Sequence, residues 1–186
     1  MGDDRKLAES AATLHATALA GGPGAALAAR RAALLAERSD PDLARQALSV
    51  LVQLEPLDPA PRLALARLHA ERGELAAAQS EAQAVLSEAI DQGARARAAF
   101  MLGEMARVSN DAAAARLAYE TTLKIEDTLL AANRSDPTAA RWYARARGRL
   151  AELDARDGHF DRARAGAEGA LALLRATAAQ TGETPV

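Results

Sequence analysis

Residues 68–78 read LHAERGELAAA, and a glycine interrupts an otherwise helix-forming run. Inside one continuous helix, Gly73 would cost roughly 1 kcal/mol relative to alanine. Glycine readily adopts the left-handed backbone conformation found where helices end, so it is favoured between one helix and the next. The stretch therefore predicts two helices joined by a sharp turn at Gly73.

Helix-start and helix-stop signals divide the rest of the chain in the same way. Three segments place a capping side chain before a proline that suits the first helical turn: Ser39-Asp40-Pro41, Asp58-Pro59 and Ser135-Asp136-Pro137. Turn-forming residues interrupt the apolar periodicity at 21–24, 73, 93, 110 and 158. No alternating run indicates a strand. The predicted helices span residues 4–20, 25–38, 41–55, 59–72, 75–90, 95–108, 111–132, 137–156 and 160–176.

Composition limits what the chain can be. Its 186 residues are 49% hydrophobic but only 3% aromatic, which favours a thin core of closely packed helix pairs. The net charge of -2 provides no positive field for a polyanion, so we expect no nucleic-acid binding. There is no cysteine, the first ten residues are polar and acidic, and no apolar run is long enough for a membrane span. These features predict a soluble, cytoplasmic protein that does not enter a membrane.

The predicted helix pairs recur with a period of 34 residues. Residues 25–58 and 59–92 are adjacent blocks of this length, and in register LLAERSDPDLARQAL lies over LHAERGELAAAQSEA. Further blocks follow at 96–129 and 144–177, with Asn110 and Gly158 in the place of Gly73. A fixed period of this size indicates a repeat architecture in which each unit packs against its neighbours.

The repeated pattern resembles the tetratricopeptide repeat (TPR), a helix-turn-helix unit of 34 residues. The matching small and large residues are Leu65, Ala66, Gly73, Ala78 and Ala82 in the second block, Leu102, Gly103, Ala115 and Tyr119 in the third, and Leu150, Ala151, Gly158 and Ala167 in the fourth. The aromatic residues often found in such repeats are mostly missing. The resemblance implies an all-α, right-handed α-solenoid of about four TPR-like repeats.

The chain is then organised as follows. Residues 1–24 are expected to form an N-terminal capping helix and a GGPG linker, residues 25–177 the TPR-like repeat domain, and residues 178–186 a flexible tail. The 14 extra residues of segment 130–143 predict a longer hairpin between the third and fourth repeats. Within it, at most one of the adjacent Trp142 and Tyr143 is expected to face the interior, because neighbouring helical residues point about 100° apart.

The resemblance implies a concave groove, lined by the first helix of each repeat, that holds a peptide or protein segment. The expected groove residues are Leu63, Arg67, Arg97, Phe100, Glu104, Arg107, Arg141, Arg145, Arg149 and Arg156. Arg141, Arg145 and Arg149 recur every four residues and so share one helix face. Arginine matches carboxylates and phosphates, which favours an acidic ligand. Alternatively, these arginines are paired with Glu104 and Glu152 and bind nothing.

The sequence therefore favours a protein-interaction adaptor or scaffold without cofactor or metal. A self-assembling scaffold is an alternative, because Leu171 and Leu174 of the last helix would leave an apolar face uncovered, and homo-oligomers could form there. A small cytosolic chaperone for a secreted client is another. The lysine and asparagine positions of the two-carboxylate clamp found in some relatives do not match here, which disfavours an Hsp70 or Hsp90 co-chaperone.

Catalysis is not expected. The three histidines, His15, His69 and His159, are scattered and have no partner at metal-ligand spacing. No nucleophile motif, phosphate loop or dinucleotide fingerprint occurs, and the GGPG segment has no preceding strand. We therefore predict a protein that is not an enzyme.

Overall fold

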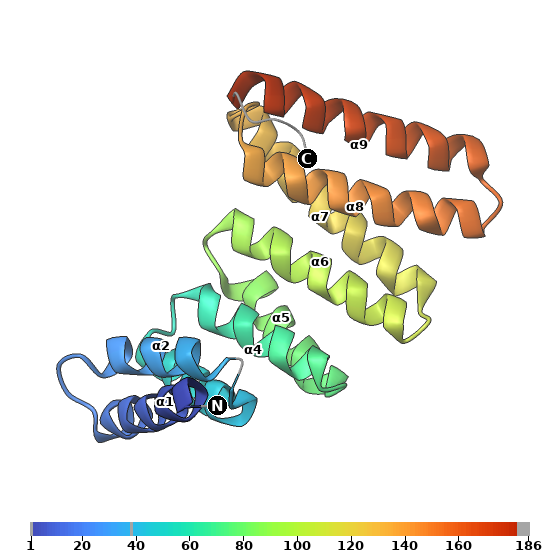
Figure 1. Ribbon diagram of the computed structural model, residues 1–186. Coiled ribbons are helices and arrows are strands. Elements are labelled where there is room, and N and C mark those ends of the chain that lie inside the picture. Colours follow the sequence, from blue (N-terminus) through green and yellow to red (C-terminus); the bar gives the residue numbers. More distant parts are fainter. Residues whose placement is uncertain (1, 38, 182–186) are drawn as a thin grey trace. The chain divides into compact units, whose positions relative to one another are not determined.

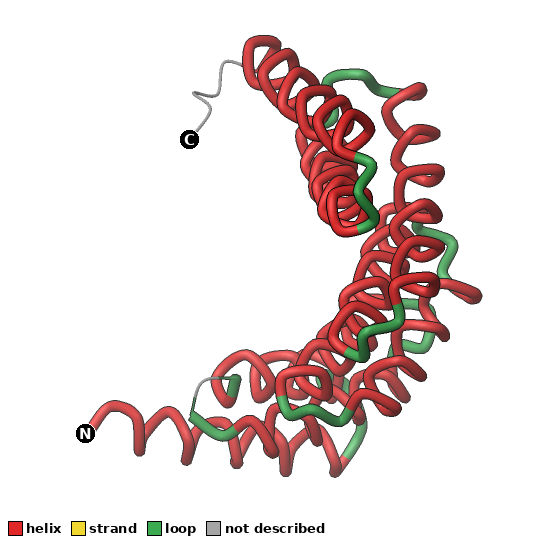
Figure 2. The backbone as a smooth tube through the Cα atoms, turned by 90° about the vertical axis from the view of Figure 1, so that its right-hand side faces the viewer, coloured by secondary structure: helices red, strands yellow, loops and turns green. Residues whose placement is uncertain are grey.

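A computed structural model describes residues 2–37 and 39–181, and this part of the chain contains helices and loops but no strand (Figure 2). The helices follow one another through short connections, as Figure 1 shows. They are α1 (Gly2–Ala20), α2 (Ala25–Ala36), α3 (Pro41–Leu54), α4 (Pro59–Glu71), α5 (Leu75–Glu88), α6 (Gln92–Val108), α7 (Ala112–Ala132), α8 (Pro137–Arg156) and α9 (Phe160–Thr181). The all-α prediction is confirmed.

In the described part of the chain, aspartate side chains cap the N-termini of five helices. Asp40, Asp58 and Asp136 each accept a hydrogen bond from a backbone N–H of the first turn, at 3.0, 2.9 and 2.8 Å. These are the three caps that the aspartate-proline pairs predict. Asp91 and Asp111 cap α6 and α7 in the same way, at 2.9 Å each, without a following proline. Because Asp91 is the cap, α6 begins at Gln92, three residues before the predicted start.

Among the described residues, three hairpins share the same turn. Gly73, Asn110 and Gly158 have positive φ values of 75°, 59° and 81°. In each turn, the residue that follows donates its backbone N–H to the carbonyl five residues earlier in the chain, at 2.9, 2.8 and 2.8 Å. This is the hydrogen-bond pattern of a helix that ends in the left-handed conformation. Gly73 is therefore explained: it ends α4 and lets α5 begin two residues later.

Two compact units divide the chain, Met1–Ala84 and Val85–Val186, and the boundary falls within α5. In the first unit, α1, α2, α3 and α4 pack in sequence, each against the next. Its core is dominated by buried alanines, including Ala11, Ala32, Ala36 and Ala47, with Leu48 among them. Small side chains at these positions let the helix backbones approach closely, as the composition predicts.

The second unit has longer helices and an aromatic core. Here α6 packs on α7, α7 on α8 and α8 on α9, and α7 and α8 have 21 and 20 residues against 13 in α4. Phe100 and Tyr119 are buried in the core, while Trp142 and Tyr143 are both partly buried against it. The expectation that at most one of Trp142 and Tyr143 faces the interior was therefore wrong.

The C-terminal helix is longer than predicted. α9 continues to Thr181, whereas its predicted end is residue 176. Residues 178–181 of the expected flexible tail are thus helical, and the rest of that tail lies outside the described residues.

Candidate functional site

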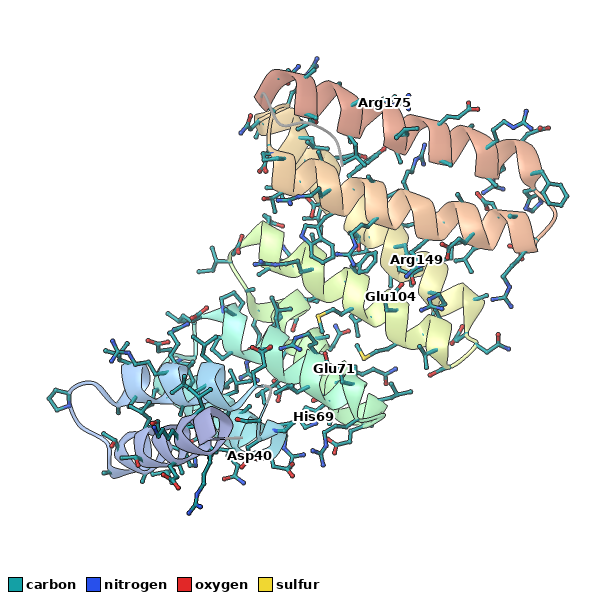
Figure 3. All side chains as sticks on the ribbon, viewed as in Figure 1. Asp40, His69, Glu71, Glu104, Arg149 and Arg175 are labelled. Carbon is teal, nitrogen blue, oxygen red and sulfur yellow. The ribbon has the colours of Figure 1, made fainter. Side chains whose placement is uncertain are left out.

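Glu104, on α6, is the centre of a hydrogen-bond network that connects three helices of the second unit. Its Oε1 accepts hydrogen bonds from the Tyr119 hydroxyl of α7 at 2.5 Å and from Arg149 Nε of α8 at 2.8 Å. Its Oε2 accepts from Arg149 Nη2 at 3.0 Å and from Arg107 Nη2 at 3.2 Å. Figure 3 shows Glu104 and Arg149 next to each other between α6 and α8. Arg107 and Arg149, two of the expected groove arginines, therefore already have a carboxylate partner within the protein.

The surroundings of Glu104 stabilise its ionised form. Burial alone would raise the pKa of this carboxyl, but the hydrogen bonds from Tyr119, Arg149 and Arg107 outweigh it and lower the pKa below its usual value. The pKa of Tyr119 is raised by burial and by the adjacent carboxylate. Glu104 is thus a fixed negative charge at neutral pH, and Tyr119 remains a hydrogen-bond donor to it.

Arg145, one turn of α8 before Arg149, is held in a different way. Its guanidinium carbon lies 4.7 Å from the ring centre of Trp142 and 5.3 Å from that of Phe100. The two rings contact each other edge to face, with centres 5.3 Å apart. Among the described residues, no carboxylate forms an ion pair with Arg145. Stacking on aromatic faces orients a guanidinium while leaving the N–H donors at its edge available to a carboxylate.

Arg141 lies one further turn toward the start of α8. Its Nε donates to the backbone carbonyl of Pro137 at 3.2 Å, and no carboxylate of the described chain pairs with it. Arg141 and Arg145 are both exposed. The spacing of four residues places them on the same side of the helix, so they can act together on one ligand.

A hollow of ≈ 670 Å³ opens beside these two arginines, between α8 and α9. Its lining includes Arg141, Trp142 and Arg145 from α8 and Ala170, Leu171 and Leu174 from α9. Leu171 is 46% exposed, although it is a large apolar residue. The apolar face that the sequence predicts on the last helix is therefore present. It borders Arg141 and Arg145, the two arginines described above as having no carboxylate partner in the described chain. We call this surface the α8–α9 groove.

The other expected groove residues are held by pairs or lie elsewhere. Arg97 is 3.6 Å from Asp91, and Arg156 donates to the Asn110 side chain at 3.5 Å. Leu63 and Arg67 belong to the first unit. Arg67 pairs there with Glu37 and, at 2.8 Å, with Glu71. Within the second unit, the structure joins Glu104, Arg107 and Arg149 in one network and places Arg145 against Phe100. Arg141 pairs with none of these described residues and donates a hydrogen bond to the Pro137 carbonyl.

A second hollow, of ≈ 290 Å³, lies in the first unit among α2, α3 and α4. Leu34, which is 70% exposed, and Leu48 contribute apolar surface. Its charged residues are already paired: Arg30 with Glu55 and Asp58, and Arg67 with Glu37. A ligand there would have to break these pairs, so this hollow is a weaker candidate than the α8–α9 groove.

Sequence reasoning missed the aromatic support of Arg145. Trp142 and Arg145 are three residues apart on one helix, which is a signal that they share a face. The contact with Phe100 had no such signal, because it depends on how α8 packs against α6.

In the described part of the chain, no three histidine, aspartate or glutamate residues gather in a way that could hold a metal ion. A search of the same residues for a helix with the length and apolarity of a membrane span finds none.

Comparison with known proteins finds a similar fold but no similar sequence. No protein-family model and no curated protein matches the chain. A solved structure titled "Crystal structure of MamA" is similar, with a TM-score of 0.64 over 95% of this chain and 92% of that one, at 17% sequence identity. MamA is a helical repeat solenoid. The fold of the chain is therefore an all-α solenoid of helix-turn-helix repeats.

Proposed function

We propose that the chain is a TPR-type scaffold that recognises an acidic segment of a partner protein. The repeat period of 34 residues, the three equivalent turns and the likeness to MamA support the repeat class. A binding role rather than a catalytic one fits the site, which consists of arginines, aromatic rings and apolar side chains. A cytoplasmic location stays a prediction.

The observation that carries the proposal is the contrast between two arginines on the same helix. Arg149 is saturated by Glu104 and Glu152, with contacts of 2.8 to 3.1 Å. Arg145 has no acidic partner in the described chain and is held against two aromatic rings. A charged group that is oriented but unpaired favours binding, because the ligand does not have to displace an existing partner.

A selection of peptides tests the proposal. Random peptides displayed on phage are enriched on the immobilised full chain, and their affinities are then measured for the wild type and for Arg145→Glu. We expect enriched peptides rich in aspartate and glutamate, and a loss of roughly tenfold or more in affinity for the variant. Arg31→Glu, an exposed arginine of α2 that forms no ion pair among the described residues, is the matched control.

Two results would overturn the proposal: enriched peptides without acidic residues, or equal affinities for Arg145→Glu and wild type. A double replacement of Arg145 and Arg149 would be less informative. It removes a pair that holds α8 to α6, so lost binding could reflect lost structure.

Self-assembly is a second candidate function, favoured by the exposed Leu171 beside Leu174 on α9. A second copy could cover this apolar surface and form a dimer or a longer assembly. Light scattering over a concentration series tests this role. A monomer at every concentration would exclude it.

A further inference from the structure

The walls of the α8–α9 groove are two helices packed side by side, as Figure 1 shows. Helix backbones satisfy their own hydrogen bonds within the walls. An extended peptide in the groove would lose water from its N–H and C=O groups and find few backbone partners to replace it. A helical ligand avoids this cost, because its backbone is already hydrogen bonded.

The dimensions of the groove also suit a helix. Its lining on α8 runs from Thr138 to Gly148, which corresponds to about 15 Å, or three turns, at the helical rise of 1.5 Å per residue. Gly148 and Ala170 contribute little or no side chain to this surface. Small residues at a helix surface let another helix approach closely, while Leu171 and Leu174 provide apolar contact for its side chains.

The positive charge of the groove indicates a ligand with negative charges. Arg141 and Arg145 line it, and no acidic side chain is among the described residues that do. Their separation of four residues matches two carboxylates placed four residues apart on a partner helix. The aromatic support of Arg145 by Trp142 fixes one of these two charges at the edge of the groove.

We infer that the α8–α9 groove binds an amphipathic, acidic helix of another protein. The apolar face of that helix covers Leu171 and Leu174, and two carboxylates at positions i and i+4 pair with Arg141 and Arg145. This inference rests on the proposed function and adds the conformation and the pattern of the partner segment.

The peptides enriched on the full chain provide the test, because the ligand is defined by the selection itself. We expect their apolar residues at spacings of three and four, and their acidic residues four apart. Circular dichroism should show that a peptide gains helix on binding. Leu171→Asp should weaken binding roughly tenfold or more, since it places a charge in the apolar part of the groove.

Leu117→Asp is the matched control. Leu117 is also an exposed leucine, on α7, and it does not line the groove. Its replacement should leave affinity unchanged. Thermal melting of both variants verifies that they fold.

The outcomes separate the inference from the proposed function. Acidic peptides that need Arg145 but bind in an extended form, or ignore Leu171→Asp, would overturn the inference and leave the proposed function standing. Peptides that depend on neither residue would overturn both. Dimers of the chain that Leu171→Asp converts to monomers would show that a second copy occupies the groove, which also overturns the inference.

Discussion

Arg149 and Glu104 form a forked pair across α8 and α6, with Nε 2.8 Å from Oε1 and Nη2 3.0 Å from Oε2. This geometry is the strong form of an arginine-carboxylate contact, since two parallel hydrogen bonds add to the charge attraction. The Tyr119 hydroxyl shares the same Oε1, so α7 is held as well. The periodicity of α8 places Arg149 and Arg145 on one face, but their roles differ. Arg149 holds α8 to α6, whereas Arg145 lies against the aromatic rings without a carboxylate partner in the described chain.

Replacement of Glu104 by glutamine should destabilise the second unit. The change removes the charge on which Arg149, Arg107 and Tyr119 converge, and a partly buried arginine then lacks its counterion. We expect a loss of roughly 1–3 kcal/mol in the free energy of unfolding, measured by urea titration at pH 7. Glu152→Gln removes an exposed partner of Arg149 and should change stability by only about 0.5 kcal/mol or less.

Lowering the pH should remove the stabilisation that the Glu104 network provides. Because the folded pKa of Glu104 is below its ordinary value, the stabilisation is present at neutral pH and is lost as the pH falls through the folded pKa. The stability difference between wild type and Glu104→Gln should therefore shrink in acid. A difference that stays constant down to the lowest pH would contradict this assignment.

The sequence predicts the positions of the helices well, because the signals that start and stop them are local. Asp58, before Pro59, caps the start of α4, and Gly73 forms the turn at its end. Each residue affects only the backbone a few residues away. The pairing of side chains from different helices, in contrast, has no local signal in the sequence. The repeat register raises Glu104 as a partner of these arginines, but nothing in the sequence indicates that Arg149, 45 residues later, forms the pair and Arg145 does not. Which arginines lack a carboxylate partner depends on packing between helices, so the sequence could predict the groove residues as a set but not their pairing.

Gly103 should not tolerate a side chain. A Cβ built at this position of α6 would lie 2.5 Å from Cε1 of Tyr119, closer than carbon atoms can approach. Gly103→Ala should displace the ring and its bond to Glu104, and destabilise the unit by roughly 1–3 kcal/mol despite the better helix propensity of alanine. Gly169→Ala in α9, where the space is open, should instead stabilise by up to about 1 kcal/mol. Equal effects of the two variants in thermal melting would argue against the close contact.

Asn110 occupies the turn position that glycine fills in the two other hairpins with this turn, at Gly73 and Gly158. Its φ of 59° is unfavourable for a residue with a side chain, though asparagine tolerates it better than most. Asn110→Gly should therefore be neutral or stabilise by roughly 0.5 kcal/mol, whereas Asn110→Ala should destabilise by about 1 kcal/mol. Urea titration of both variants measures the difference. If alanine were the better replacement, the turn would not require the left-handed conformation.

Glu126 of α7 should make stability depend on pH near neutrality. The side chain is 1% exposed, and its Oε2 has no hydrogen-bond partner among the described residues. Burial, together with the negative charges of Asp136 and Asp91, raises the pKa of this carboxyl to about 7, and Arg97 opposes the shift only in part. The folded state thus holds the proton more tightly than the unfolded state does. The contribution of Glu126 is fully favourable below the ordinary pKa and is lost as the pH rises to about 7.

Glu126→Gln should remove this dependence. Glutamine keeps the shape of the protonated acid but cannot ionise, so the variant should be more stable than wild type at pH 8 by roughly 1–3 kcal/mol and nearly equal to it at pH 4. Urea titrations across this range measure the two curves. Asp127→Asn, the exposed neighbour on the same helix, is the control and should run parallel to wild type. Parallel curves for Glu126→Gln as well would contradict this assignment, because they would mean that the carboxyl has the same pKa in the folded and the unfolded protein.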